Sequence, residues 1–120
     1  MSAAAELPTS EPDALPLQIE PDTLAAWRAE GFAHALIDVR EPWETEICRI
    51  DGSLDVPMGE FADALGRIPN DRPVVVLCHH GMRSMQVVGW LRGQGWNNAT
   101  NLRGGIDLWA ARVYPGMRRY

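Results

Sequence analysis

The pattern of hydrophobic and polar positions predicts short strands and helices that alternate from residue 17 onward. The clearest strand covers residues 74–77, four consecutive aliphatic residues after a polar turn that ends in Pro73. A run that is apolar at every position is typical of a central parallel strand buried on both faces. The other predicted strands cover residues 17–20, 35–39, 54–56 and 99–102.

Residues with helical spacing separate these strands. Pro21 and Gly31 bound the first predicted helix. Further helices are expected at residues 60–65, 84–92 and 105–111, with one helical turn at 43–47. Three tryptophans at apolar helical positions are expected in the core: Trp27, Trp90 and Trp109. This alternation predicts an α/β fold with a central, mainly parallel sheet of about five strands and helices on both faces.

A single domain accounts for the chain, because 120 residues is an ordinary domain size. Three prolines among small and acidic residues predict a disordered lead-in over residues 1–16. The domain is expected over residues 17–114, followed by a solvated tail over residues 115–120. The longest apolar run, residues 74–78, is far shorter than the ~20 residues of a membrane span, so no membrane partner is expected.

The distribution of charge restricts the possible chemistry. The chain has 16 acidic and 11 basic residues, all of the latter arginine, for a net charge of −5. Residues 1–60 hold most of the acids, whereas residues 61–120 carry a net positive charge and are suited to binding a small anion. The lack of lysine excludes lysine Schiff bases and a Walker A loop. An acidic chain without a basic run argues against nucleic acid as a partner.

The two cysteines, Cys48 and Cys78, form no CxxC or CxxH pattern, which predicts neither a disulfide framework nor a zinc site. The side chains of Cys78, His79 and His80 are consecutive, and such side chains rarely converge on one ion, so we expect no metal. The first residues lack a basic segment followed by an apolar core. A cytoplasmic location is therefore expected.

Cys78 is the candidate nucleophile, because it directly follows the clearest strand. Ligands of parallel α/β sheets bind beyond the carboxyl ends of the strands. The loop after Cys78 leads into a helix, whose first N–H groups and dipole favour an anion such as a thiolate. Arg83 adds a permanent positive charge, and His79 and His80 can add partial ones. Gly81 allows the loop to curl around the sulfur. The alternative interpretation is a buried core cysteine.

Three segments of the chain carry a family resemblance. Residues 78–84 read Cys-His-His-Gly-Met-Arg-Ser, residues 38–41 read Asp-Val-Arg-Glu before Ile-Asp-Gly-Ser at residues 50–53, and residues 104–109 read Gly-Gly-Ile-Asp-Leu-Trp. In this order they resemble the active-site loop, the first signature and the closing signature of rhodanese-like sulfurtransferases. The resemblance covers about residues 17–112. Where that family usually has Gly-His-Ile, this chain has Cys-Arg-Ile.

The resemblance implies a rhodanese-like fold and a sulfurtransferase that needs no cofactor. Cys78 would take a sulfur from a small anionic donor such as thiosulfate, hold it as a persulfide, and pass it to a thiol, cyanide or protein acceptor. Asp38 and Arg40 are supporting residues that either touch the substrate or form an ion pair that braces the loop. Glu44 is expected to pair with an arginine, and Cys48 to be a bystander. The residues expected to bind the donor are His79, His80, Gly81, Met82, Arg83 and Ser84.

Other interpretations stay open. A phosphatase of the protein-tyrosine type has a Cys-x5-Arg loop, whereas Cys78 and Arg83 form a shorter Cys-x4-Arg loop that suits a compact sulfane sulfur better than a phosphate. A binding module without catalysis, or a persulfide carrier for one protein acceptor, is also compatible with the pattern. Arg83 either orients the donor or pairs with an acid such as Asp38 or Glu41. The basic loop favours a doubly charged inorganic donor over mercaptopyruvate, and no oligomeric state is specified.

Overall fold

The structure is a computed structural model that describes residues 15–120. Five parallel strands form one sheet in the order β1-β5-β4-β2-β3. The strands are β1 (Gln18–Ile19), β2 (Ala35–Asp38), β3 (Leu54–Asp55), β4 (Val74–Leu77) and β5 (Ala99–Leu102). The predicted α/β fold is confirmed, and β4 lies at the centre of the sheet, between β5 and β2.

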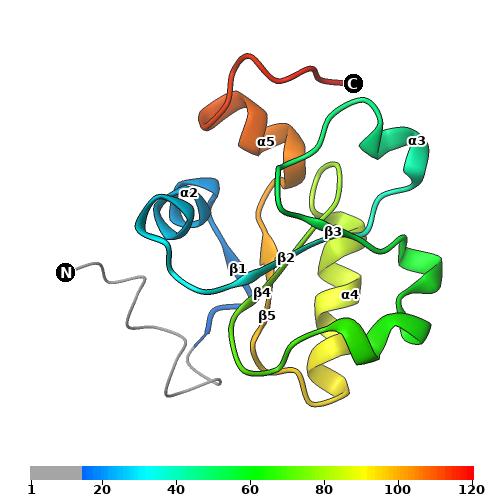
Figure 1. Cartoon of the computed structure of the whole chain (residues 1–120). Helices are drawn as coiled ribbons and strands as arrows, with labels where there is room; N and C mark the ends of the chain where they lie inside the picture. Colours follow the sequence, from blue (N-terminus) through cyan, green and yellow to red (C-terminus); the bar gives the residue numbers. More distant parts are fainter. Residues whose placement is uncertain (1–14) are drawn as a thin grey trace.

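Helices cover both faces of the sheet, as the alternation of elements predicts. They are α2 (Pro21–Glu30), α3 (Pro42–Thr45), α4 (Met82–Gly93) and α5 (Gly105–Arg112). Figure 1 shows α2 and α5 on one side of the sheet and α4 on the other. Between residues 15 and 120, no helix has the length and apolar character needed to cross a membrane.

The helix predicted at residues 60–65 is instead a pair of short 3-10 helices, η2 (Met58–Glu60) and η3 (Ala62–Arg67). Each of them contains a glycine, Gly59 or Gly66, and glycine has a low helix propensity. A 3-10 helix is typically short, so the segment forms two such helices in place of a single α-helix. This connection covers one face of the sheet beside α4.

Alternate side chains of β4 contribute to two separate cores. Val74 and Val76 pack with side chains of α4, η2 and η3, whereas Val75 and Leu77 pack with side chains of α2 and α5. All four are fully buried, as expected for a central strand. Burying such a side chain contributes about 1.5–3 kcal/mol, so this strand is a rigid base for the loop that follows it.

The prediction that three tryptophans lie in the core is right for two of them. Trp27 and Trp109 are buried, but Trp90 is 39% exposed and meets Phe61 edge-on at a ring distance of 6.4 Å. The reason is the rotation of α4, which places Trp90 beside the stripe that faces the sheet. That stripe consists of Val87, Val88 and Leu91.

The packed domain begins earlier than the sequence predicts. Residues 1–14 of the expected lead-in lie outside the described residues. Leu15, however, is buried in the core beneath α2 and α5. The carbonyl groups of Leu15 and Pro16 each accept a hydrogen bond of 3.0 Å from the Arg92 guanidinium. The chain is therefore already packed at residue 15, two positions before the predicted boundary.

The parallel sheet brings the three signature segments to one edge. Asp38 ends β2, Cys78 directly follows β4, and Gly104 comes shortly after β5. Because these three strands are adjacent and parallel, their carboxyl ends lie side by side. Segments that are far apart in the sequence therefore surround the same loop.

Candidate active site

The Cys78 sulfur lies at the centre of a curled loop and faces polar hydrogens. Sγ accepts the backbone N–H of Gly81 at 3.1 Å and that of Ser84 at 3.4 Å, and the Ser84 hydroxyl lies 3.3 Å away. Gly81 has φ +101°, a conformation that glycine adopts at no steric cost and other residues rarely adopt. Cys78 is 1% exposed, so it is buried and also set among donors suited to a thiolate or persulfide.

The start of α5 fixes the loop from the side of the sheet. The N–H groups of Ile106 and Asp107 donate to the carbonyl oxygens of Cys78 and His79, at 2.9 and 3.1 Å. This approach requires glycine at Gly105, because a Cβ there would collide with those same two carbonyl oxygens. The closing Gly-Gly signature is therefore a packing requirement of the active-site loop.

The predicted donor-binding residues fall into two groups. A small open pocket of about 280 Å³ is lined by Cys78, His79, His80, Met82 and Arg83. Gly81 and Ser84 contribute from inside the loop, through the bonds that they donate to the sulfur. α4 begins at Met82, two residues earlier than predicted, so Arg83 belongs to the first helical turn.

Asp38 and Arg40 form the bracing ion pair, which was one of the two expected alternatives. Both side chains are fully buried, and Arg40 Nη2 lies 2.8 Å from Asp38 Oδ2. Arg40 also donates to the carbonyl oxygens of Glu44 and Cys48, at 3.2 and 2.7 Å. Burial disfavours the charged guanidinium, yet the hydrogen bonds to Asp38 and Tyr120 raise the pKa of Arg40. In this structure neither Asp38 nor Arg40 reaches the pocket.

Glu44 pairs with Arg83, which agrees with the prediction that Glu44 binds an arginine. The guanidinium makes two parallel bonds to the carboxylate, Nη1 to Oε2 at 2.7 Å and Nη2 to Oε1 at 2.8 Å. Glu44 is 3% exposed, and Arg83 holds the pKa of this carboxyl at about 2 against the opposing effect of burial. The alternative partners of Arg83, Asp38 and Glu41, are wrong; Glu41 instead precedes α3 and shares a capping box with Glu44.

His79 departs from the expectation that both histidines can add partial positive charge. The His79 ring is stacked between the rings of His80, at 3.9 Å, and Tyr120, at 3.8 Å. Burial, followed by the neighbouring His80, lowers the pKa of His79, so its ring is neutral at pH 7. The permanent positive charge at the pocket is that of Arg83, and the start of α4 adds the potential of the helix dipole.

One group of metal-binding side chain types lies beside the pocket. Donor atoms of His79, His80 and Asp107 lie within 4.8 Å of one another, so the two consecutive histidines do come close together. Arg119 already pairs with the Asp107 carboxylate at 3.0 Å. Because that carboxylate has a cationic partner, we assign no ion to the group.

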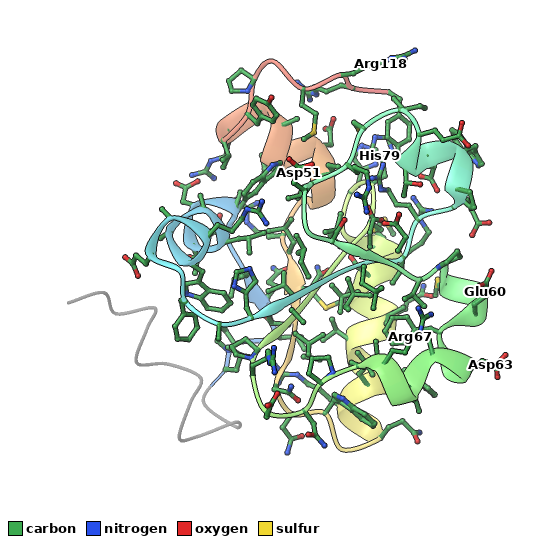
Figure 2. The ribbon with its side chains drawn as sticks, viewed as in Figure 1. Asp51, Glu60, Asp63, Arg67, His79 and Arg118 are labelled. Atoms are coloured by element: carbon green, nitrogen blue, oxygen red, sulfur yellow. The ribbon has the colours of Figure 1, made fainter. Side chains whose placement is uncertain are left out.

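Tyr120 is packed against the domain, although the sequence predicts a solvated tail over residues 115–120. Most of that tail is exposed, but its last residue is partly buried. The Tyr120 ring lies almost parallel to that of His79, with an angle of 8° between the planes, and its hydroxyl bonds to Arg40 and Glu44. Figure 2 shows His79 beneath the last segment of the chain, while Arg118 points away from the molecule. The end of the described chain is therefore part of the wall around the active-site loop.

Comparison with known proteins identifies the family. The profile of the Rhodanese-like domain matches residues 20–112. The chain belongs to the rhodanese-like domain family. The match starts and ends close to the limits of the resemblance, about residues 17–112, and it includes the whole loop around Cys78.

Rhodanese-like relatives of different lengths match the chain. The probable adenylyltransferase/sulfurtransferase MoeZ of Mycobacterium tuberculosis is 36% identical over 104 residues, which are 85% of this chain and 26% of MoeZ. The chain thus spans about a quarter of that relative. Thiosulfate sulfurtransferase GlpE of Pseudomonas entomophila is 33% identical, with 82% of this chain and 88% of GlpE covered. A rhodanese-related protein from Thermoplasma volcanium has a TM-score of 0.75 at 30% identity, covering 83% and 96% of the chains.

Sequence reasoning missed two residues of this rhodanese-like site. Asn101 on β5 donates to the Gly81 carbonyl at 3.2 Å, and its Oδ1 lies 2.5 Å from the Ser84 hydroxyl. A signal for it exists, because Asn101 is a polar residue within the strand predicted at residues 99–102. Tyr120 has no such signal, since nothing in the local pattern of the last residues links it to residues 76 positions away.

Proposed function

We propose that this rhodanese-like protein is a thiosulfate sulfurtransferase in which Cys78 carries the sulfur. The observation that supports this most directly is the environment of Sγ, which faces the N–H groups of Gly81 and Ser84 at the base of a small pocket. Such preorganised donors stabilise negative charge on sulfur without reorganisation during the reaction. The name of the relative GlpE supports thiosulfate as the donor.

The proposed reaction has two half-reactions. The Cys78 thiolate attacks the terminal sulfur of thiosulfate, the S–S bond of the donor breaks, and sulfite leaves with the electron pair. The outer sulfur of the resulting persulfide is then attacked by a thiol, cyanide or protein acceptor, and the Cys78 thiolate is regenerated. This is nucleophilic catalysis with ping-pong kinetics. A reducing compartment such as the cytoplasm would keep Cys78 and Cys48, both free here, as thiols.

The test is intact-protein mass spectrometry of the purified protein combined with a turnover assay. After treatment with thiosulfate the mass is expected to rise by one sulfur atom, and cyanide is expected to restore it and release thiocyanate. Hydrolysis of an aryl phosphate, measured in parallel, should stay at background. Phosphate release without any thiocyanate would overturn the proposal in favour of a phosphatase. A persulfide that forms but is not passed to cyanide or small thiols would indicate a carrier instead of a thiosulfate:cyanide enzyme.

Arg83 is the proposed donor-orienting residue. Two of its N–H groups bind Glu44. Its other N–H groups form no hydrogen bond with any residue from 15 to 120, so they are available to an anion in the pocket that Arg83 lines. Arg83→Ala is expected to raise KM for thiosulfate roughly tenfold or more, for a lost charge-assisted contact of ~1.5–3 kcal/mol. It should also lower the melting temperature, because Glu44 loses its cationic partner.

A double variant separates these two effects. Glu44→Gln/Arg83→Ala removes both charges, so the buried carboxylate that the single variant leaves unpaired is no longer present. Steady-state kinetics and thermal melting of both variants are the measurements. We expect the melting temperature to recover in the double variant while KM stays high. If KM for thiosulfate is normal in both variants, Arg83 has only a structural role.

A further inference from the structure

The Tyr120 hydroxyl joins two ion pairs that otherwise share no side-chain to side-chain bond among the described residues. It accepts an N–H of Arg40 at 3.1 Å and donates to Glu44 Oε1 at 2.7 Å. The same carboxylate oxygen accepts Arg83 Nη2 at 2.8 Å. A continuous path of hydrogen bonds thus runs from the buried Asp38–Arg40 pair to the guanidinium that lines the pocket.

Independent contacts hold Tyr120 in this position. Its ring lies 3.8 Å from that of His79 and meets Trp43 edge-on at 5.9 Å. The adjacent Arg119 pairs with Asp107 on α5 at 3.0 Å. Burial raises the pKa of Tyr120 to about 12, so the hydroxyl keeps its proton at neutral pH and remains a donor to Glu44.

The bond from Tyr120 affects how much of the charge of Arg83 is available to a ligand. Glu44 is a buried carboxylate, and its Oε1 has two donors, the Tyr120 hydroxyl and Arg83. Without the Tyr120 hydroxyl, Arg83 alone would bond to Oε1 and balance its negative charge, because the other hydrogen bonds to the carboxylate reach Oε2. The guanidinium would then have less positive potential left for an anion in the pocket, and its position would be less restricted.

We propose that Tyr120 is a positioning residue for donor binding, which acts through Glu44 on the Arg83 guanidinium. The inference rests on the proposed function, because it assigns to Arg83 the binding of an anionic sulfur donor. It differs from a purely structural role of the last residues, which would affect folding but not the affinity of the pocket for anions.

The variant that tests this is Tyr120→Phe, which keeps the ring against His79 and removes only the hydroxyl. We expect KM for thiosulfate to rise about three- to tenfold, the range for one lost hydrogen bond, with kcat little changed. Tyr114→Phe is the matched control, because Tyr114 is an exposed tyrosine of the same segment. It should leave both constants unchanged. A normal KM in Tyr120→Phe would overturn the proposal.

A double-mutant cycle tests whether the effect passes through Glu44 and Arg83. In the Glu44→Gln/Arg83→Ala background, the additional change Tyr120→Phe is expected to leave KM unchanged, because the charge that it modulates is gone. An equal rise of KM in both backgrounds would show that Tyr120 acts by another route and would overturn the inference.

A readout without any sulfur donor keeps this inference separate from the proposed function. In a Cys48→Ser background, the rate of Cys78 alkylation by anionic iodoacetate is divided by the rate with neutral iodoacetamide. This ratio reports the positive potential of the pocket. It is expected to fall in Tyr120→Phe, towards the value of Arg83→Ala, and to stay unchanged in Tyr114→Phe. If the wild type forms no thiocyanate but the ratio falls in Tyr120→Phe, the proposed function is wrong while the role of Tyr120 stands. An unchanged ratio contradicts the role of Tyr120.

Discussion

Replacing Cys78 by serine is expected to abolish sulfur transfer completely. The hydroxyl that takes the place of the thiol is a far weaker nucleophile towards sulfur and forms no persulfide. The fold should be retained, because serine is slightly smaller than cysteine and its oxygen can accept the bonds that Gly81 and Ser84 donate to Sγ. Thiocyanate production at background level and an unchanged intact mass after thiosulfate treatment are the expected measurements.

Cys48→Ser is the matched control for this experiment. Cys48 is the other free cysteine, it is partly buried, its Sγ lies 3.9 Å from Arg40 Nη1, and it does not line the pocket of Cys78. This variant should gain one sulfur atom from thiosulfate and turn over at close to the wild-type rate. Sulfur addition that survives Cys78→Ser and disappears in Cys48→Ser would contradict the assignment of the nucleophile.

The second large effect is expected for the stability of Arg40→Met. Methionine keeps most of the apolar stem of Arg40 but leaves the Asp38 carboxylate without its cationic partner in a site that is 0% exposed. Removing one member of a buried ion pair typically costs about 3–5 kcal/mol. The free energy of unfolding in urea should fall by that amount, and the melting temperature by about 10 °C or more.

Arg49→Met provides the comparison for Arg40→Met. Arg49 pairs with Asp55 at 3.0 Å, but both side chains are about 40% exposed, at 40% and 41%. Solvent screens such a pair, so its loss should change the free energy of unfolding by at most about 1 kcal/mol. Similar stabilities of the two variants would mean that the Asp38–Arg40 pair does not brace the fold. A double change, Asp38→Asn with Arg40→Met, should recover part of the lost stability.

Much of the fold and the nucleophile could be predicted from local patterns. The apolar run at residues 74–77 is buried on both faces in any parallel sheet, and a cysteine at its carboxyl end necessarily lies at the ligand-binding edge. The sequence also predicts that Gly81 lets the loop curl around the sulfur, and Gly81 indeed has a positive φ of 101°, which few other residues tolerate. The conformational freedom of glycine and the periodicity of hydrophobic residues depend only on neighbouring positions, so the local sequence is enough to predict their structural effects.

The pairing of charged side chains could not be predicted in the same way. The sequence predicts that Glu44 binds an arginine, yet the chain has eleven of them, and only the packing of α3 against the start of α4 selects Arg83, 39 positions away. The same holds for Trp90, whose exposure depends on a small rotation of α4. A small rotation of a helix leaves the hydrophobic pattern of the sequence unchanged. That pattern specifies which face of the helix is buried but not which residues pack against it.

By itself, the sequence determined the α/β class, the order of strands and helices, and the position of Cys78 in a loop that starts a helix, because these follow from periodicity and from the residues that end each element. Only the tertiary structure decided what surrounds that loop. Asn101, Glu44 and Tyr120 reach it from three distant segments, and their contacts depend on where whole elements lie in space. Local composition does not indicate such long-range contacts. The residues next to Tyr120 in the sequence would be the same whether its ring were exposed to solvent or, as here, stacked on His79.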